Sequence, residues 1–148
     1  MMRRSRAREV ALQLLFQRDQ NATAIPRSAI RAFAKERLRN DAESVDFCLA
    51  LYDGVGTNLA AIDAKLTATA ENWRLSRMMP VDRNVLRMGI YELSHAAEPT
   101  PIAVAIDEAI ELSRRFGSAD SPAFVNGILD RIAKPAPAPP PVPAPEAS

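Results

Sequence analysis

Four arginines stand close together near the start of the chain, with Glu9 as the only acidic residue beside them: Arg3, Arg4, Arg6 and Arg8. The guanidinium group stays charged at physiological pH, and its forked N–H donors match the oxygens of a phosphate group. Arginine-rich segments can be mobile arms that become ordered on RNA. The pattern therefore favours an RNA-contacting segment, and a solvated tail without a ligand is the alternative.

The net charge of +1 hides an uneven distribution along the chain. Residues 1–39 contain ten Lys/Arg and three Asp/Glu, whereas residues 40–148 contain nine Lys/Arg and fifteen Asp/Glu. A basic segment attached to an acidic body indicates a polyanion on one face and a different partner elsewhere. The alternative is a solvated surface whose charges are skewed by chance.

Residues that could catalyse a reaction are few and poorly grouped. His95 is the only histidine, which excludes a metal site built from several histidines. Cys48 is the only cysteine and lies in a hydrophobic repeat, which is typical of a core thiol. Three carboxylates are clustered on one predicted helix: Asp107, Glu108 and Glu111. No histidine, phosphate-binding loop or cofactor motif accompanies them, so we interpret them as a solvated helix face. We therefore expect a binding protein without a catalytic site, metal or cofactor.

The composition also bears on the compartment. A single cysteine excludes an internal disulfide, and no apolar run has the length needed to span a bilayer. The first residues lack the apolar stretch and cleavage site of a secretory signal. These features predict a cytoplasmic protein that does not enter a membrane.

Hydrophobic residues recur with helical period through nearly all of residues 7–132. In the first segment they follow the i, i+3, i+4, i+7, i+8 spacing of one buried stripe: Ala7, Val10, Ala11, Leu14 and Leu15. Further helices are predicted at 28–38 and 81–93, and after the starts Thr100–Pro101 and Ser121–Pro122. No β-type alternation competes, so the predicted fold is all-α.

The clearest stripe covers residues 45–66 and predicts one long helix that crosses the domain. Gly54 and Gly56 weaken the middle of this helix. Glycine there can instead allow another helix to approach closely.

Leu12 and Phe16 fall roughly opposite the buried stripe of the first helix. Two apolar side chains on an outer face predict a partner-binding surface. The alternative is that another helix of the same fold covers them.

From residue 135 onward the sequence reads PAPAPPPVPAPEAS. Such a segment has few backbone donors and little to bury, which predicts a disordered tail with local polyproline-II structure. We therefore predict a helical domain over residues 1–134 and a Pro/Ala-rich tail over 135–148.

Several stretches resemble the NusB family of transcription antitermination factors, and together they cover about residues 4–133. In chain order they are RAREVALQLLF (6–16), YDGVGTNLAAID (52–63), WRLSRMMPVDRNVLRMGIYEL (73–93), PIAVAIDEAIELSRRFG (101–117) and FVNGILDRIA (124–133). Each stretch alone is modest evidence, but their order and spacing are highly specific.

The resemblance implies a compact helical domain made of two small helix bundles. It implies a protein partner, the small-subunit ribosomal protein NusE, and an RNA partner, the boxA element of nascent ribosomal RNA transcripts. It also implies a place in the antitermination complex on RNA polymerase, which suppresses premature termination.

The resemblance also places RNA-contacting residues on this chain. The basic RNA-contacting segment of the family falls on three N-terminal arginines, Arg4, Arg6 and Arg8. The phenylalanine of the last-helix motif, which lies near RNA in the family, is Phe124. Asn126 and Gly127 follow in the same motif, and we interpret them as structural: a hydrogen bond between helices and a site of close packing.

The partner-contacting residues implied by the resemblance lie elsewhere. The aromatic position that meets NusE falls on Phe16, where many relatives have tyrosine, so a hydroxyl hydrogen bond is missing here. The acidic NusE-facing position is Asp82, and an acidic position implicated in complex formation is Asp120. Leu12 joins this set through its place beside Phe16 on the outer face of the helix.

Two other functions stay open. NusB-like domains also occur at the N-terminus of ribosomal RNA cytosine methyltransferases, which need a downstream S-adenosylmethionine domain. Unless the Pro/Ala-rich stretch is a linker to such a domain, we expect antitermination rather than methyl transfer. The second alternative is a protein-interaction module or homodimer, in which the outer apolar face self-associates and covers the arginines.

Overall fold

The computed structural model describes residues 2–71 and 74–134, which form seven α-helices and one short 3₁₀-helix. In chain order these are α1 (Met2–Gln20), α2 (Arg27–Arg37), α3 (Ala42–Thr57), α4 (Leu59–Thr69), the 3₁₀-helix η1 (Leu75–Arg77), α5 (Pro80–Ser94), α6 (Ile102–Phe116) and α7 (Ser121–Ala133). No strand occurs within the described ranges, which confirms the all-α prediction. The predicted tail at 135–148 lies outside them.

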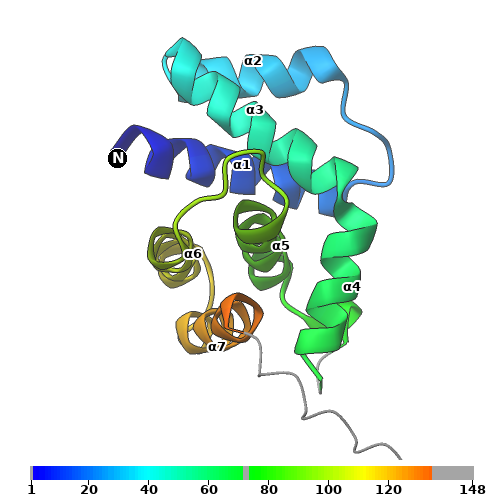
Figure 1. Cartoon of the computed structure of the whole chain (residues 1–148). Helices are drawn as coiled ribbons and strands as arrows, with labels where there is room; N and C mark the ends of the chain where they lie inside the picture. Colours follow the sequence, from blue (N-terminus) through cyan, green and yellow to red (C-terminus); the bar gives the residue numbers. More distant parts are fainter. Residues whose placement is uncertain (1, 72–73, 135–148) are drawn as a thin grey trace, which may run out of the picture.

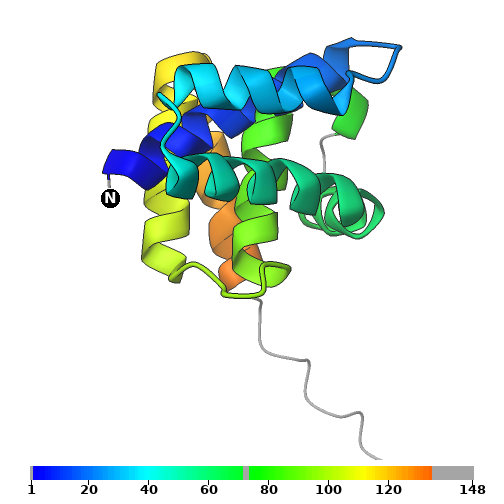
Figure 2. The same ribbon diagram turned by 90° about the horizontal axis from the view of Figure 1, so that it is seen from above.

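The helices form two small bundles that share one core. Helices α1, α2 and α3 run across the upper part of Figure 1, while α5, α6 and α7 are seen nearly end-on below them. Helix α4 contacts α5 and α7 and flanks them on one side. Helix α1 contacts α2 and α3 in its own bundle and α5 in the other, so it lies between the two bundles (Figure 2).

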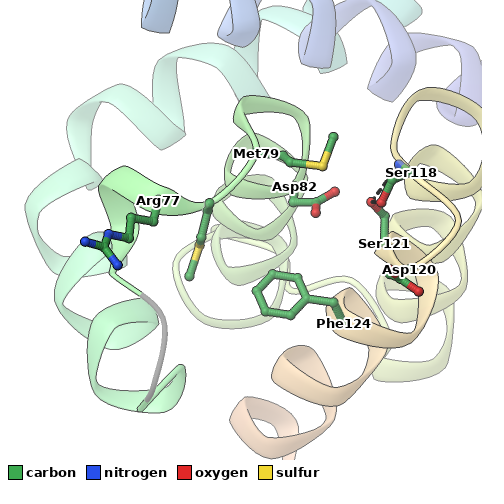
Figure 3. A pocket seen from close by; sticks show the side chains of 8 residues that line it. Arg77, Met79, Asp82, Ser118, Asp120, Ser121 and Phe124 are labelled. Carbon is green, nitrogen blue, oxygen red and sulfur yellow. Dashed lines mark hydrogen bonds between the residues drawn. The ribbon is translucent and has the colours of Figure 1, made fainter.

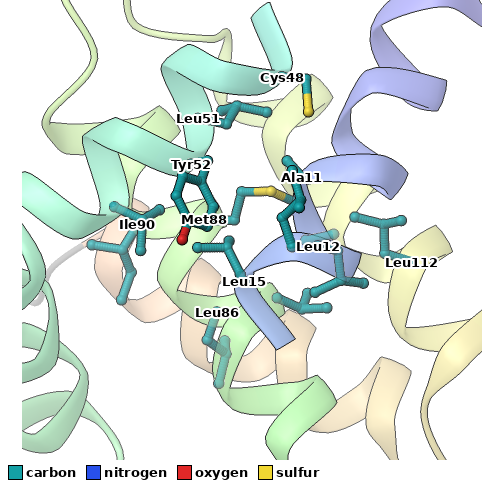
Figure 4. Close-up of a cluster of buried hydrophobic side chains, with 14 of the residues drawn as sticks. Ala11, Leu12, Leu15, Cys48, Leu51, Tyr52, Leu86, Met88, Ile90 and Leu112 are labelled. Carbon is teal, nitrogen blue, oxygen red and sulfur yellow. The ribbon is translucent and has the colours of Figure 1, made fainter. Parts of the chain in front are cut away.

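The shared core explains why α1 is more buried than its sequence predicts. Side chains from α1, α3, α5 and α6 meet there (Figure 4). The predicted stripe of α1 is buried, but Leu12 is buried with it and is only 3% exposed. The prediction that Leu12 lies on an outer face is therefore wrong. A helix enclosed by two bundles buries more than one stripe of its surface.

The prediction of one long helix over residues 45–66 is also wrong. Helix α3 ends at Thr57, α4 begins at Leu59, and the two are bent by 74° relative to each other. At the bend, the Gly54 carbonyl oxygen accepts hydrogen bonds from both the backbone N–H and the side-chain amide of Asn58, at 3.1 and 2.8 Å. Side-chain bonds of this kind often accompany a bend in a helix. The alternative explanation for Gly54 is confirmed, because a side chain there would collide with the ring of Tyr91 from α5.

The described helices differ from membrane-spanning helices in length and composition. None of them, taken singly, is both long and apolar enough to cross a membrane. Helices α3 and α4 reach that length and composition only as a pair, across their 74° bend. Both helices contribute buried side chains to the shared core, among them Val55 and Ile62.

Candidate nucleic-acid interface

The N-terminal arginines belong to the first two turns of α1 and are helical. Arg3, Arg4 and Arg6 are exposed, as an RNA-contacting segment requires. The guanidinium carbon of Arg4 lies 4.6 Å from the centre of the Phe47 ring in α3, which holds this side chain against the body of the protein. The segment expected as an arm thus presents its arginines from a helix.

Arg8 has a different role, and its prediction as an RNA-contacting residue is wrong. It is 2% exposed, and its Nη2 and Nε atoms donate hydrogen bonds of 2.7 and 3.0 Å to the Glu92 carboxylate of α5. The Thr100 hydroxyl donates to the same carboxylate at 2.9 Å, and no side chain caps the start of α6. A buried arginine neutralised in this way fixes α1 against α5.

Glu9 lies between two exposed arginines, Arg6 of α1 and Arg115 of α6. One of its oxygens lies 2.8 Å from Arg6 Nη1, and its two oxygens accept hydrogen bonds of 3.2 Å from Arg115. Burial alone would raise the pKa of Glu9, but the hydrogen bonds and charges of both arginines outweigh burial and lower it. The ionised Glu9 therefore holds Arg115 beside the N-terminal arginines. Sequence reasoning missed Arg115 because it is 106 residues away from Glu9.

Phe124, Asp82 and Asp120 line one hollow at the N-terminal ends of α5 and α7, which we call the acidic hollow (Figure 3). Asp82 is buried, and its Oδ1 atom has no hydrogen-bond partner among the described residues. A buried oxygen without a donor is unfavourable. The structure thus brings one residue predicted to contact RNA next to two that are predicted to contact the partner.

A second hollow, the apolar hollow, lies between α1, α2, α5 and α6. Phe16 is 38% exposed at this hollow, together with Phe33 of α2, Val81 of α5 and Phe116 of α6. Exposed aromatic side chains around a hollow are typical of a protein-binding surface. Phe16 therefore lies where a partner can reach it. Leu12 also lines this hollow, although little of it is exposed.

A third hollow lies between the start of α1 and the end of α2, and we call it the arginine hollow. The basic side chains that line it are Arg3, Arg6, Arg37 and Arg39. Arg37 also lines the apolar hollow, and Val81 of the apolar hollow precedes Asp82 of the acidic hollow. The arginine hollow and the apolar hollow thus share Arg37, and successive residues of α5 line the apolar and acidic hollows. Residues predicted to contact RNA line the arginine and acidic hollows, and the partner candidate Phe16 lines the apolar hollow.

The residues that were considered for catalysis have structural positions. Cys48 is buried, and burial raises the pKa of its thiol to about 12, which confirms that it is a core thiol. Glu108 accepts a hydrogen bond of 2.6 Å from the Ser5 hydroxyl, so it is not part of a solvated face. Asp107 and Glu111 on the same helix are exposed, as predicted.

The residues that form the described helices are nearly the same residues that match a known protein family. Residues 5–134 match the model of the NusB family. The chain belongs to the NusB family. Among its NusB relatives, the transcription antitermination protein NusB of Sorangium cellulosum is 46% identical over 131 residues, which cover 88% of this chain and 91% of that protein. The NusB protein of Anaeromyxobacter dehalogenans is 44% identical over 135 residues, which cover 91% and 93%.

Solved structures of NusB proteins have the same fold. T. maritima NusB is 38% identical and superposes with a TM-score of 0.78, covering 89% of this chain and 91% of that chain. A structure of the antitermination factors NusB and NusE in complex with double-stranded RNA is 24% identical, with a TM-score of 0.76 and coverage of 90% and 98%. At that identity the second structure supports the fold alone.

Two residues of the last-helix motif in this NusB-family chain do not have the structural roles that we predicted for them. Asn126 and Gly127 are exposed, and no atom lies within 4 Å of a side-chain carbon added at Gly127. The prediction of close packing at Gly127 is therefore wrong. The prediction of a hydrogen bond between helices through Asn126 is also wrong. Sequence reasoning also missed Arg37 and Arg39, for which the only indication was the general basic charge of residues 1–39.

Proposed function

We propose that this NusB-family protein is a transcription antitermination factor that binds boxA-type RNA in ribosomal RNA transcripts together with the ribosomal protein NusE. In this role it joins the antitermination complex on RNA polymerase and suppresses premature termination. The observation that carries the proposal is that a hollow lined by four arginines shares Arg37 with an apolar hollow lined by the aromatic side chains of Phe16, Phe33 and Phe116. The two hollows offer adjoining surfaces for a polyanion and for a protein.

The RNA-binding part of the proposal assigns different tasks to the N-terminal arginines and to Phe124. The exposed Arg3, Arg4 and Arg6 bind phosphate groups, which gives affinity without sequence preference. The Phe124 ring in the acidic hollow stacks on a base, which adds sequence preference. Arg8 is left out of the RNA-binding set, because Glu92 neutralises it inside the protein.

The NusE-binding part places the partner on the apolar hollow and its acidic edge. Phe16 supplies an exposed ring, and Leu12 lies beside it in the same hollow. Asp82 lines the acidic hollow, and the exposed Asp120 adds a second carboxylate to the same hollow. NusE bound there lies beside any RNA that reaches both Arg6 and Phe124, so the two ligands strengthen each other's binding.

The alternative of a methyltransferase domain is less well supported than antitermination. The two relatives named above are antitermination proteins, and this chain covers 91% and 93% of their length. We propose that the protein has no catalytic activity of its own. We also propose a cytoplasmic location, since bacterial transcripts are made there.

The test is a salt titration of binding to boxA RNA and to a scrambled RNA, with and without the cognate NusE protein. Phosphate contacts make the affinity for both RNAs fall steeply with salt. NusE should raise the affinity for boxA RNA more than for the scrambled RNA, and Phe124→Ala should reduce this preference. Equal binding of both RNAs under every condition would contradict the proposal.

Self-association through the apolar hollow is the remaining alternative, because exposed Phe16 and Phe116 could pair with a second copy. Sedimentation of the protein without NusE distinguishes self-association from NusE binding at this hollow. A dimer that dissociates in the Phe16→Asp variant would support self-association. A protein that is monomeric at all concentrations would support NusE binding at the apolar hollow.

A further inference from the structure

The turn between α2 and α3 holds two consecutive residues with a left-handed backbone. Arg39 has a φ of 53° and Asn40 a φ of 57°, and neither is glycine. Asparagine tolerates this conformation well, but arginine adopts it rarely. The Asn40 N–H donates to the Lys35 carbonyl oxygen at 2.8 Å, and Leu38 is buried, so the turn is firmly held. Non-glycine residues held in such conformations cluster at functional sites.

The turn places Arg39 in the arginine hollow, where side chains from three segments meet. Arg3 and Arg6 come from α1, Arg37 from the last turn of α2, and Arg39 from the turn that follows. Asp41 is the only acidic residue that lines the hollow. Four guanidinium groups around one carboxylate create a positive potential that attracts polyanions.

Glu9 pairs with Arg6 at 2.8 Å, but the other acidic groups near this hollow form no short ion pair with its arginines. Asp41 caps α3, since it accepts a hydrogen bond of 3.2 Å from the Ser44 N–H, and bonds from Ser44 lower the pKa of Asp41. Arg3 lies 3.9 Å from both Asp41 and Glu43, which is much longer than a direct charge-assisted hydrogen bond. Within the described part of the chain, no carboxylate oxygen lies within 4.0 Å of the Arg39 guanidinium.

We propose that Arg37 and Arg39 complete a phosphate-binding site with Arg3 and Arg6, and that RNA backbone phosphates occupy it. The inference rests on the proposed function, and it extends the RNA-binding surface from α1 to the α2–α3 turn. Guanidinium groups from separate elements can bind successive phosphates of one strand. Since the hollow offers no aromatic side chain for stacking, its contribution is independent of RNA sequence.

The decisive variant is Arg39→Asn, because asparagine accepts the left-handed backbone and removes only the charge and its fork of donors. Its thermal unfolding should match the wild-type protein or improve on it. Binding to boxA RNA and to scrambled RNA should weaken equally, by about two- to fivefold, as expected for one exposed charge contact. The slope of log affinity against log salt between about 50 and 200 mM should fall by about 0.7 for each lost phosphate contact.

The matched control is Arg31→Gln, which removes the same charge from an exposed position of α2 that does not line the hollow. It should leave the affinity and the salt slope unchanged. A wild-type slope for Arg39→Asn, or the same loss for Arg31→Gln, overturns the inference. If the wild-type protein binds boxA and scrambled RNA equally, the proposed function fails, yet the slopes still decide the role of Arg39. A wild-type protein that binds neither RNA overturns both.

Discussion

Arg6 and Arg8 stand two positions apart on α1, and their surroundings give them different tasks. Arg6 is exposed and lines the arginine hollow, whereas Arg8 is bonded to Glu92 inside the protein. Sequence alone presents them as equivalent members of one basic run. The carboxylate that distinguishes them lies 84 residues further along the chain.

Alanine substitutions should separate these two tasks. Arg8→Ala leaves the Glu92 charge buried without its partner, so we expect the free energy of unfolding to fall by about 3 kcal/mol. Arg6→Ala should change it by less than about 0.5 kcal/mol, since Arg6 is exposed, but should weaken binding of all RNAs. Urea denaturation and RNA titration of both variants test this. Equal stability of the two variants would contradict the structural role of Arg8.

Asp19 makes stability depend on pH. It accepts hydrogen bonds from Arg83 at 3.0 Å and from Asn84 at 3.2 Å, and lies 3.4 Å from Arg87. Burial alone would raise the pKa of Asp19, but these neighbours outweigh burial and lower it below its ordinary value of 3.8. A lowered folded-state pKa adds stability above the unfolded pKa, and this stability is lost as the pH falls through the folded pKa.

We therefore expect Asp19→Asn to reduce the free energy of unfolding by about 2 kcal/mol at pH 7. The difference from the wild-type protein should shrink as the pH falls below 3.8, because Asp19 of the wild-type protein loses its charge first in the unfolded chain and, at lower pH, in the folded protein. Urea denaturation of both proteins across this range is the measurement. A difference that stays constant with pH would show that the Asp19 charge is not involved.

At the scale of helices, alanine substitutions at two glycines should have opposite effects on stability. Gly54 of α3 lies against the Tyr91 ring, whereas nothing lies near Gly127 in the middle of α7. Gly54→Ala should destabilise the protein by about 2 kcal/mol, since the ring must move. Gly127→Ala should stabilise it by about 0.5–1 kcal/mol, because alanine is the better helix former. Thermal unfolding of both variants tests the pair, and two changes of the same sign would contradict this account of the α3–α5 contact.

The helices themselves could be predicted from sequence, because hydrophobic period is a local property. The break between α3 and α4 could not, since the apolar spacing runs unchanged through Asn58, and the close approach at Gly54 depends on Tyr91 from another helix. The exposure of Phe16 was predicted, whereas the burial of Leu12 depends on how the two bundles enclose α1. The arginine hollow could not be predicted from sequence, because its lining residues come from three separate segments of the chain.

At the scale of the whole molecule, the arrangement of the hollows predicts how protein and RNA binding can be separated. Phe16→Asp puts a charge into the apolar hollow, so we expect NusE pairing to be lost while the circular dichroism spectrum stays unchanged. Ile102→Asp is the control, because Ile102 is also exposed but does not line this hollow. Pull-down with purified NusE tests both variants. Loss of pairing in both, or in neither, would place the interface elsewhere.

Helix α1 is tied to α5 near both of its ends, through Arg8 and Glu92 at one and through Asp19 and Arg83 at the other. Local opening of α1 must therefore separate two groups of ion pairs, so amide hydrogens in its middle should exchange with solvent only when most of the protein unfolds. Since α1 also carries Arg6 and Phe16, the surfaces for RNA and for protein are present or absent together. A ligand on either surface should then slow amide exchange along the whole of α1.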